Sequence, residues 1–145
     1  PLLQDNIGEL LKLLAQDKAL RTEIETNGSI DLKPFADIEN RPYFTMDYKQ
    51  PSSGMEGQMC LSNFELLKEN DTVKFVSGCR EDLERAKEII EKYKLTERCG
   101  VILSPMYGAI EPSHMVEFLI ENNMNDVNIQ LQLHKFIWDK DTRGV

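Results

Sequence analysis

Hydrophobic and polar positions alternate strictly near the C-terminus of the chain. The apolar members are Val127, Ile129, Leu131 and Leu133, and the polar members are Asn128, Gln130, Gln132 and His134. Because successive side chains of a strand point to opposite faces, residues 127–134 are predicted to form a β-strand with one polar face. That face either contacts water in a half-exposed sheet or lines a wet functional cavity. This stretch alone leaves both interpretations open.

Upstream of this stretch, helical and strand patterns alternate. The predicted helices are residues 6–16, 61–67, 81–93 and 112–121. The predicted strands are residues 22–26, 43–49, 73–77 and 100–103. Strands that alternate with helices are joined by crossovers, which favours an α/β fold with a parallel sheet of about five strands, open or rolled into a barrel. We expect residues 1–145 to form a single domain.

Polar side chains occupy one face of several predicted strands. Glu23, Glu25 and Asn27 share a face of the first strand, and Asp47 and Lys49 share a face of the second. Strands covered by helices on both sides are apolar on both faces, so these groups are predicted to line a solvated cavity. Parallel α/β sheets bind ligands at the carboxyl ends of their strands. The mixture of charges and amides suits a zwitterionic or heterocyclic small molecule.

Composition narrows the classes of function. A formal net charge of −8 argues against general binding to nucleic acid or to anionic membranes. No apolar run approaches the roughly 20 residues of a membrane span, and no signal-peptide pattern is present. The odd cysteine count, with Cys60, Cys79 and Cys99 far apart, predicts neither a disulfide framework nor a metal-ligand set. We therefore expect a protein of the reducing cytoplasm.

Several motifs together resemble one enzyme family. Residues 25–28 (ETNG) resemble a strand end that contacts S-adenosylmethionine (SAM) in radical SAM enzymes, and residues 47–49 (DYK) resemble the Asp-x-Lys element of their radical-activating branch. Residues 51–55 (PSSGM), 73–78 (VKFVSG) and 130–138 (QLQLHKFIW) are similar to the 7-carboxy-7-deazaguanine synthase family. The resemblance covers essentially the whole chain.

The resemblance implies a partial (β/α) barrel and a radical ring contraction. SAM is cleaved reductively at a 4Fe–4S cluster, and the radical formed takes a hydrogen from 6-carboxy-5,6,7,8-tetrahydropterin. The product is 7-carboxy-7-deazaguanine, a precursor of the tRNA nucleoside queuosine, and Mg²⁺ assists. The cofactors implied are thus SAM, the 4Fe–4S cluster and Mg²⁺. The implied partners are the pterin substrate, a reducing flavodoxin or ferredoxin, and a second subunit in a homodimer.

The resemblance also assigns roles to individual residues. The SAM-binding positions it implies are Thr26, Asn27, Gly28, Asp47, Lys49, Ser77 and Gln132. The substrate-binding positions are His134 and the carboxylate of Val145. It places no catalytic residue and no metal ligand in this chain.

The chain departs from the family pattern at its start. The Cys-x3-Cys-x2-Cys cluster motif and the Gly-Gly-Glu motif are absent, and Pro1 corresponds to the residue after the latter. We therefore expect a C-terminal fragment that generates no radical by itself. Two alternatives stay open: an activase that installs a glycyl radical on another protein, and a non-catalytic α/β binding module.

Overall fold

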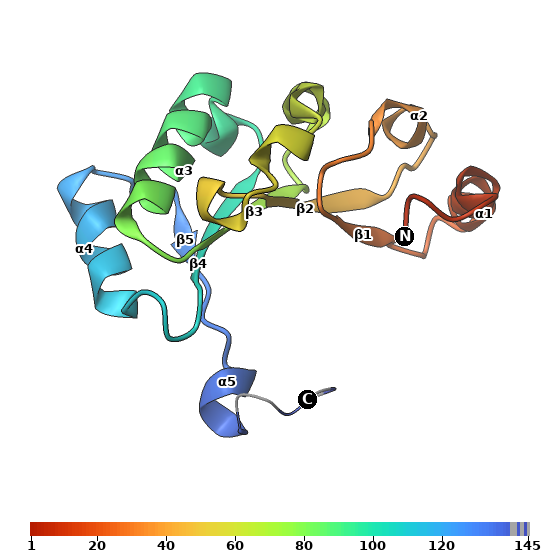
Figure 1. Ribbon diagram of the computed structural model, residues 1–145. Coiled ribbons are helices and arrows are strands. Elements are labelled where there is room, and N and C mark those ends of the chain that lie inside the picture. The colour runs from red at the N-terminus through yellow and green to blue at the C-terminus, as the bar shows by residue number, and fades with distance from the viewer. Residues whose placement is uncertain (140–141, 143, 145) are drawn as a thin grey trace.

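Five parallel strands form the centre of the protein (Figure 1). The computed structural model describes residues 1–139, 142 and 144. The strands are β1 (Glu23–Thr26), β2 (Tyr43–Tyr48), β3 (Thr72–Ser77), β4 (Gly100–Pro105) and β5 (Asn128–Ile129). The α-helices are α1 (Ile7–Leu14), α2 (Lys33–Ala36), α3 (Arg80–Tyr93), α4 (Pro112–Glu121) and α5 (His134–Ile137). Short 3-10 helices are η1 (Pro51–Ser53), η2 (Glu56–Gln58), η3 (Leu61–Leu66) and η4 (Leu95–Glu97).

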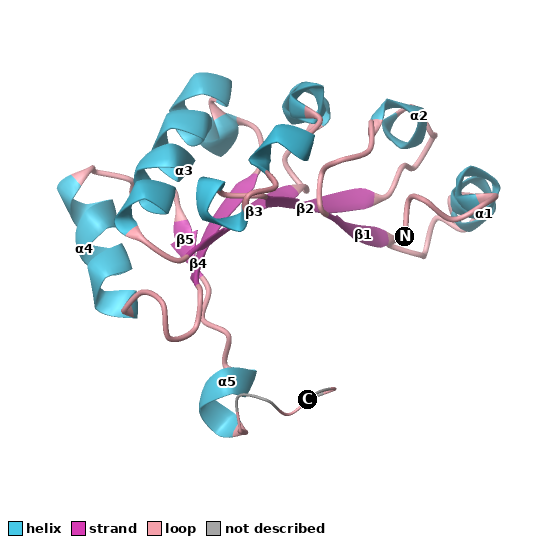
Figure 2. Cartoon of the chain, in the orientation of Figure 1, coloured by secondary structure: helices cyan, strands magenta, loops and turns pink. Residues whose placement is uncertain are grey.

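The strands lie in the sheet in the same order as in the sequence, β1-β2-β3-β4-β5. Crossovers of one hand between successive neighbours place every connecting helix on the same side of the sheet. Figure 2 shows this arrangement: α1 to α4 follow one face of the curved sheet, and the opposite face carries none of them. We call this second side the open face. The parallel sheet of the α/β prediction is confirmed, and the winding is that of a partial barrel.

The core lies between the sheet and the helices. Its sheet residues include Phe44, Met46, Val73, Phe75, Val101 and Leu103, and its helix residues include Leu83, Ala86, Ile89 and Ile90 of α3. On β2 and β3 every second side chain is buried, while the intervening ones are partly exposed on the open face. Glu23 and Glu25 of β1 are exposed. The predicted polar strand faces therefore do lie on one common side.

A buried carboxylate joins the strand starts. Asp71, which precedes β3, accepts hydrogen bonds from the backbone N–H groups of Phe44 (2.9 Å) and Lys68 (2.7 Å). Its second oxygen also lies 2.6 Å from Nη2 of Arg41. The Asp71 carbonyl accepts from Gly100 N–H, at the start of β4. One residue thereby aligns β2, β3 and β4 at their amino ends.

Two predicted elements differ from the structure. The helix predicted over 61–67 is the 3-10 helix η3. The strand predicted over 127–134 is wrong beyond Ile129, since only Asn128 and Ile129 pair with β4. Gln130 N–H still donates to Leu103 O, but the next bond of a parallel ladder requires an N–H at Pro105, and proline has none. Along the part of the chain that the structure describes, no helix has the length and apolar character needed to cross a membrane.

Candidate functional site

A tight turn follows β1 at its carboxyl end. The Thr26 hydroxyl accepts a hydrogen bond from Gly28 N–H (3.2 Å), and the Asn27 carboxamide oxygen accepts from the N–H (3.2 Å) and hydroxyl (2.8 Å) of Ser29. Gly28 has a φ of +70°, and a Cβ there would lie 2.6 Å from Cε of Met59. Only glycine fits this position without strain. We call residues 27–29 the β1 turn.

Two neighbouring cavities share the β1 turn as a wall. The first has a volume of about 280 Å³ and is lined by Pro1, Leu2, Leu3, Glu25, Thr26, Asn27, Ser29, Ile30 and Asp47. The second has a volume of about 200 Å³ and is lined by Asn27, Ser29, Lys49, Met55, Gln58 and Met59. Asn27 and Ser29 line both. The structure thus places Thr26, Asn27 and Asp47 at the first cavity and Asn27 and Lys49 at the second, while Gly28 lines neither.

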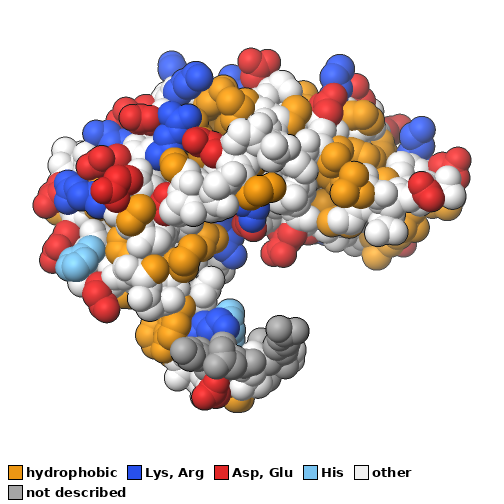
Figure 3. Space-filling model, in the orientation of Figure 1, with side chains coloured by type: hydrophobic (Ala, Val, Ile, Leu, Met, Phe, Trp, Pro, Cys, Tyr) orange, Lys and Arg blue, Asp and Glu red, His pale blue; other side chains and the backbone are white. Residues whose placement is uncertain are grey.

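Opposite charges lie side by side at these cavities. Nζ of Lys49 is 3.7 Å from a carboxylate oxygen of Asp47, and their side chains are 36% and 41% exposed. Pairs this exposed contribute little to stability, so both groups are available to a ligand. Lys49 suits a carboxylate, whereas Asp47 and Glu25 suit an ammonium group. Figure 3 shows the open face as a hollow with acidic and basic side chains along it.

Ser77 lies apart from the two cavities. It belongs to the helix-covered face of β3 together with Val73 and Phe75, and it is fully buried. Its hydroxyl accepts a hydrogen bond from Nε2 of Gln50 (3.1 Å). Oε1 of Gln50 is buried and has no hydrogen-bond partner within the described part of the chain. Ser77 therefore connects the carboxyl ends of β2 and β3 on the helix-covered face of the sheet.

Gln132 lies near the end of β4, and His134 follows it in the chain. Gln132 lines a further cavity of about 260 Å³ together with Pro105, Tyr107, Gly108, Ile110, Glu111, Pro112 and Phe136. His134 is the first residue of α5 and is partly buried. Neither residue lines the two cavities at the β1 turn. Val145 lies outside the described residues.

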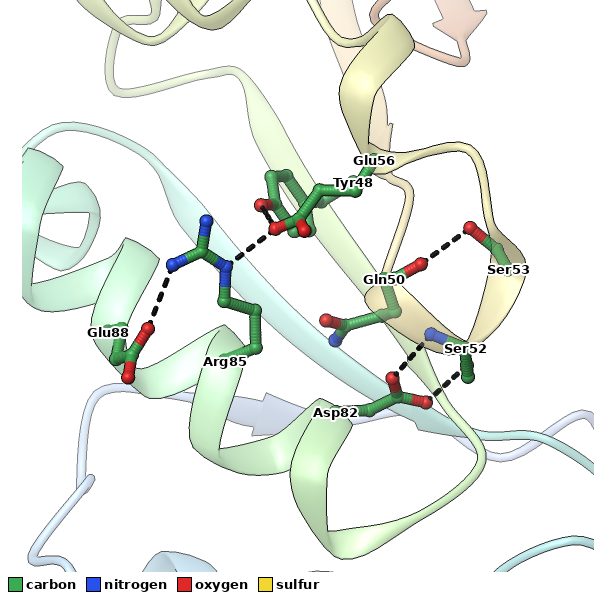
Figure 4. Close-up of polar contacts among 8 residues, drawn as sticks. All are labelled: Tyr48, Gln50, Ser52, Ser53, Glu56, Asp82, Arg85 and Glu88. Carbon is green, nitrogen blue, oxygen red and sulfur yellow. Dashed lines mark hydrogen bonds and ion pairs between the residues drawn. The ribbon is translucent and has the colours of Figure 1, made fainter.

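The segment after β2 is fixed to α3 by polar contacts that the sequence did not reveal (Figure 4). Asp82 is fully buried, and its carboxylate accepts from the hydroxyl (2.6 Å) and N–H (3.2 Å) of Ser52 and from Gly78 N–H (2.8 Å). One turn further along α3, Nε of Arg85 donates to Oε1 of Glu56 (2.6 Å), which also accepts from the Tyr48 hydroxyl. These contacts hold the wall that carries Met55 and Gln58.

The same contacts shift the pKa values of the groups involved. Burial alone would raise the pKa of Asp82, but the hydrogen bonds from Ser52 and Gly78 outweigh it and hold the pKa below its ordinary value. Burial would likewise raise the pKa of Glu56, but the hydrogen bonds from Tyr48 and Arg85 outweigh it and lower the pKa. Both carboxylates are thus stabilised in their charged form.

Asp82→Ala is expected to lower the free energy of unfolding by about 1–3 kcal/mol at pH 7, since the part-buried hydrogen bonds from Ser52 and Gly78 to a charged acceptor are lost. A carboxylate whose pKa is lower in the folded state stabilises fully above its unfolded pKa of about 3.9, and the effect is lost as the pH falls through the folded value. Urea unfolding of both proteins at pH 7 and near pH 3 tests this. The exposed Asp126→Ala provides the control. A difference that stays constant or grows on acidification would contradict the prediction.

The three cysteines do not form a ligand set for a cluster. Cys60 precedes η3, whereas Cys79 follows the carboxyl end of β3 and Cys99 precedes the amino end of β4. The sheet therefore separates Cys79 from Cys99. Among the described residues, no three His, Cys, Asp or Glu side chains lie where they would hold a metal ion together. The residues present do not fit an iron–sulfur cluster.

Comparison with known proteins gives a consistent set of relatives. The chain is 48% identical over 145 residues to the 7-carboxy-7-deazaguanine synthase of Clostridium acetobutylicum, and the match covers all of this chain and 66% of that protein. It is 37% identical over 129 residues to the enzyme of the same name from Leptospira interrogans, covering 86% of this chain and 52% of the relative. The corresponding protein of Koribacter versatilis is 31% identical over 160 residues, covering 100% of this chain and 68% of the relative.

The chain thus spans about half to two thirds of the length of these curated relatives. No family model matches the chain. No solved structure matches it either. The shared name among relatives of 31% to 48% identity agrees with the motifs at the strand ends. The chain belongs to the 7-carboxy-7-deazaguanine synthase family.

Proposed function

We propose that the complete protein containing this chain is a radical SAM enzyme that converts 6-carboxy-5,6,7,8-tetrahydropterin to 7-carboxy-7-deazaguanine, for queuosine synthesis. The observation that carries the proposal is the 48% identity, across all 145 residues, to a protein named 7-carboxy-7-deazaguanine synthase. The cavities at the carboxyl ends of β1 and β2 support it, because their paired charges suit a zwitterion. SAM has such a zwitterionic end in its methionine part.

In this proposal the β1 turn and the β2 end hold the methionine part of SAM. Lys49 donates to the carboxylate, Asp47 accepts from the ammonium group, and Thr26, Asn27 and Gly28 shape the wall beside them. Bound SAM supplies the group that takes a hydrogen atom from the pterin. The task of this chain is to bind SAM, to fix its orientation and to keep the reacting groups away from water.

Gln132 and His134 are proposed to act at the β4 end. The cavity that Gln132 lines has aromatic walls, and the rings of Tyr107 and Phe136 meet edge to face at 5.6 Å. Aromatic side chains and an amide suit a flat heterocycle with N–H and carbonyl groups. We propose Gln132 as a further SAM contact, and His134 with the Val145 carboxylate as pterin contacts. Ser77 supports this end of the sheet through Gln50.

The cluster and Mg²⁺ are proposed to be held outside these 145 residues. The three dispersed cysteines do not fit the cluster, and no residue of this chain is assigned to Mg²⁺. We therefore propose that the chain by itself does not cleave SAM. Flavodoxin or ferredoxin is the proposed source of electrons for the complete enzyme.

A homodimer in the cytoplasm completes the proposal. Large apolar side chains of residues 131–138 are exposed, including Leu133 (61%), Phe136 (60%) and Ile137 (63%). Exposed apolar clusters of this kind are typical of protein interfaces. All three cysteines are free thiols, which is the state that a reducing compartment maintains.

Anaerobic reconstitution of the complete reading frame with iron and sulfide tests the function. With reductant, SAM and the carboxytetrahydropterin, we expect 7-carboxy-7-deazaguanine and 5′-deoxyadenosine, identified by mass. The 145-residue chain treated in the same way is the control, and we expect it to yield neither product. SAM cleavage without conversion of the pterin would favour the glycyl-radical activase. Failure of the complete protein to assemble a cluster would favour a non-catalytic binding module.

A further inference from the structure

Asn63 of η3 is a fully buried amide whose side chain is hydrogen-bonded to one segment of backbone. Its Oδ1 accepts a hydrogen bond from Leu32 N–H (2.9 Å), and its Nδ2 donates to Ile30 O (2.8 Å) and to Gly28 O (3.3 Å). Residues 28–32 belong to no strand, and helix α2 begins only after them. Asn63 therefore supplies three of these backbone groups, Leu32 N–H, Ile30 O and Gly28 O, with a partner that a helix or a sheet would otherwise supply.

This segment includes the end of the β1 turn. Gly28 is held on three sides: its N–H donates to Thr26, and its carbonyl accepts from Cys60 N–H (2.9 Å) as well as from Asn63. The same turn presents Asn27 and Ser29 to both cavities. Asn63 lines neither cavity. Any effect that it has on a ligand must therefore pass through the backbone of the turn.

We propose that Asn63 is a positioning residue that keeps the β1 turn in its ligand-binding conformation and thereby sets the affinity for SAM. This inference rests on the proposed function. When a binding-competent conformation is only partly populated, the apparent affinity falls by the populated fraction. Loss of the Asn63 contacts should lower that fraction in the free protein. Bound SAM restores the turn, so the reaction of the saturated enzyme should change little.

The matched variants are Asn63→Asp and Asp71→Asn. Asn63→Asp has nearly the same shape and keeps an acceptor for Leu32 N–H, but it removes both donors to the carbonyls of Gly28 and Ile30. Asp71→Asn disturbs a similarly buried, multiply bonded side chain at the opposite end of the sheet. Both lower stability, but only Asn63 contacts the β1 turn. If Asn63→Asp does not fold, Asn63→Ala removes the amide without burying a charge.

The experiment measures SAM binding to the complete protein by equilibrium dialysis, with circular dichroism to give the folded fraction. Steady-state rates with the pterin give kcat and the KM for SAM. We expect Asn63→Asp to raise the Kd and KM for SAM about tenfold or more, with kcat at saturating SAM within about twofold of wild type. Asp71→Asn should leave the Kd per folded molecule unchanged.

The outcomes separate this inference from the proposed function. A wild-type protein that does not bind SAM overturns both. A wild type that binds SAM while Asn63→Asp binds it equally well overturns only the role of Asn63. That role is also overturned if kcat falls while Kd is unchanged, or if Asp71→Asn weakens SAM binding as much as Asn63→Asp does.

Discussion

Asp71→Ala is expected to lower the free energy of unfolding by about 3–5 kcal/mol, the range for removing one partner of a buried ion pair. The Asp71 side chain has no exposed surface, and that of Arg41 is 11% exposed. Without the carboxylate, the guanidinium has lost its counter-ion. The N–H groups of Phe44 and Lys68 also lose their acceptor. A buried donor without a partner keeps its desolvation penalty, which accounts for much of the lost free energy of unfolding.

Urea unfolding followed by circular dichroism measures this loss. The matched control is Asp37→Ala, which breaks a pair with Lys33 in which both side chains are more than 60% exposed. Exposed pairs of this kind contribute little, so the control should unfold at nearly the wild-type midpoint. If the two variants unfold at similar midpoints, Asp71 does not stabilise the amino ends of β2, β3 and β4 as its contacts indicate.

The two ends of the sheet differ in what they do. At the amino ends, Asp71 is buried and its side-chain oxygens are bonded to the backbone and to Arg41. At the carboxyl ends, Asp47 and Lys49 form a long, half-exposed pair beside two cavities. Groups whose hydrogen bonds are all made within the protein have little capacity left to bind a ligand, whereas weakly paired groups keep theirs. We therefore expect a ligand to bind at the carboxyl ends, the end at which α/β barrels bind their ligands, while Asp71 stabilises the amino ends.

Local patterns in the sequence predicted much of this fold. The helix over 112–121 has the bounds of α4, and the polar positions of β1 and β2 lie on the open face as the two-residue period requires. The same period places Ser77 with Val73 and Phe75 on the covered face, so the sequence did contain the signal that it lies behind the cavities. The end of β5 at Ile129, earlier than predicted, depends on Pro105, which lies in the neighbouring strand β4.

Contacts between distant positions were not predictable from one sequence. Asp71 reaches Arg41 across 30 positions, Ser52 reaches Asp82 across 30, and Asn63 reaches Gly28 across 35. In the sequence, each of these is an ordinary polar residue in a loop or near a helix start. Each of these residues finds its partner only when the fold places neighbouring strands and their loops side by side. The residues that hold the candidate site in shape are thus the ones that local patterns do not indicate.

Lys49→Met in the complete protein is expected to raise the Kd for SAM about 10- to 100-fold, because hydrogen bonds to charged groups are worth about 1.5–3 kcal/mol. Lys49 is the lysine that lines the cavity beyond the β1 turn, and among the described residues only Asp47, in a long pair, competes for it. Methionine keeps the length and much of the apolar stem of lysine. The variant therefore removes the charge and the donors while leaving most of the packing against the cavity wall.

Lys18→Met is the matched control for this change. Lys18 is exposed, follows α1, and lines a cavity with Lys12 and Asp37 that includes none of the β1-turn residues. Both variants remove one positive charge, so a general electrostatic effect would weaken SAM binding similarly in both and would fade with added salt. A direct contact predicts a large effect for Lys49→Met alone, much of which persists at high salt because a partly desolvated pair is screened less. Unchanged binding by Lys49→Met would exclude Lys49 from the SAM site.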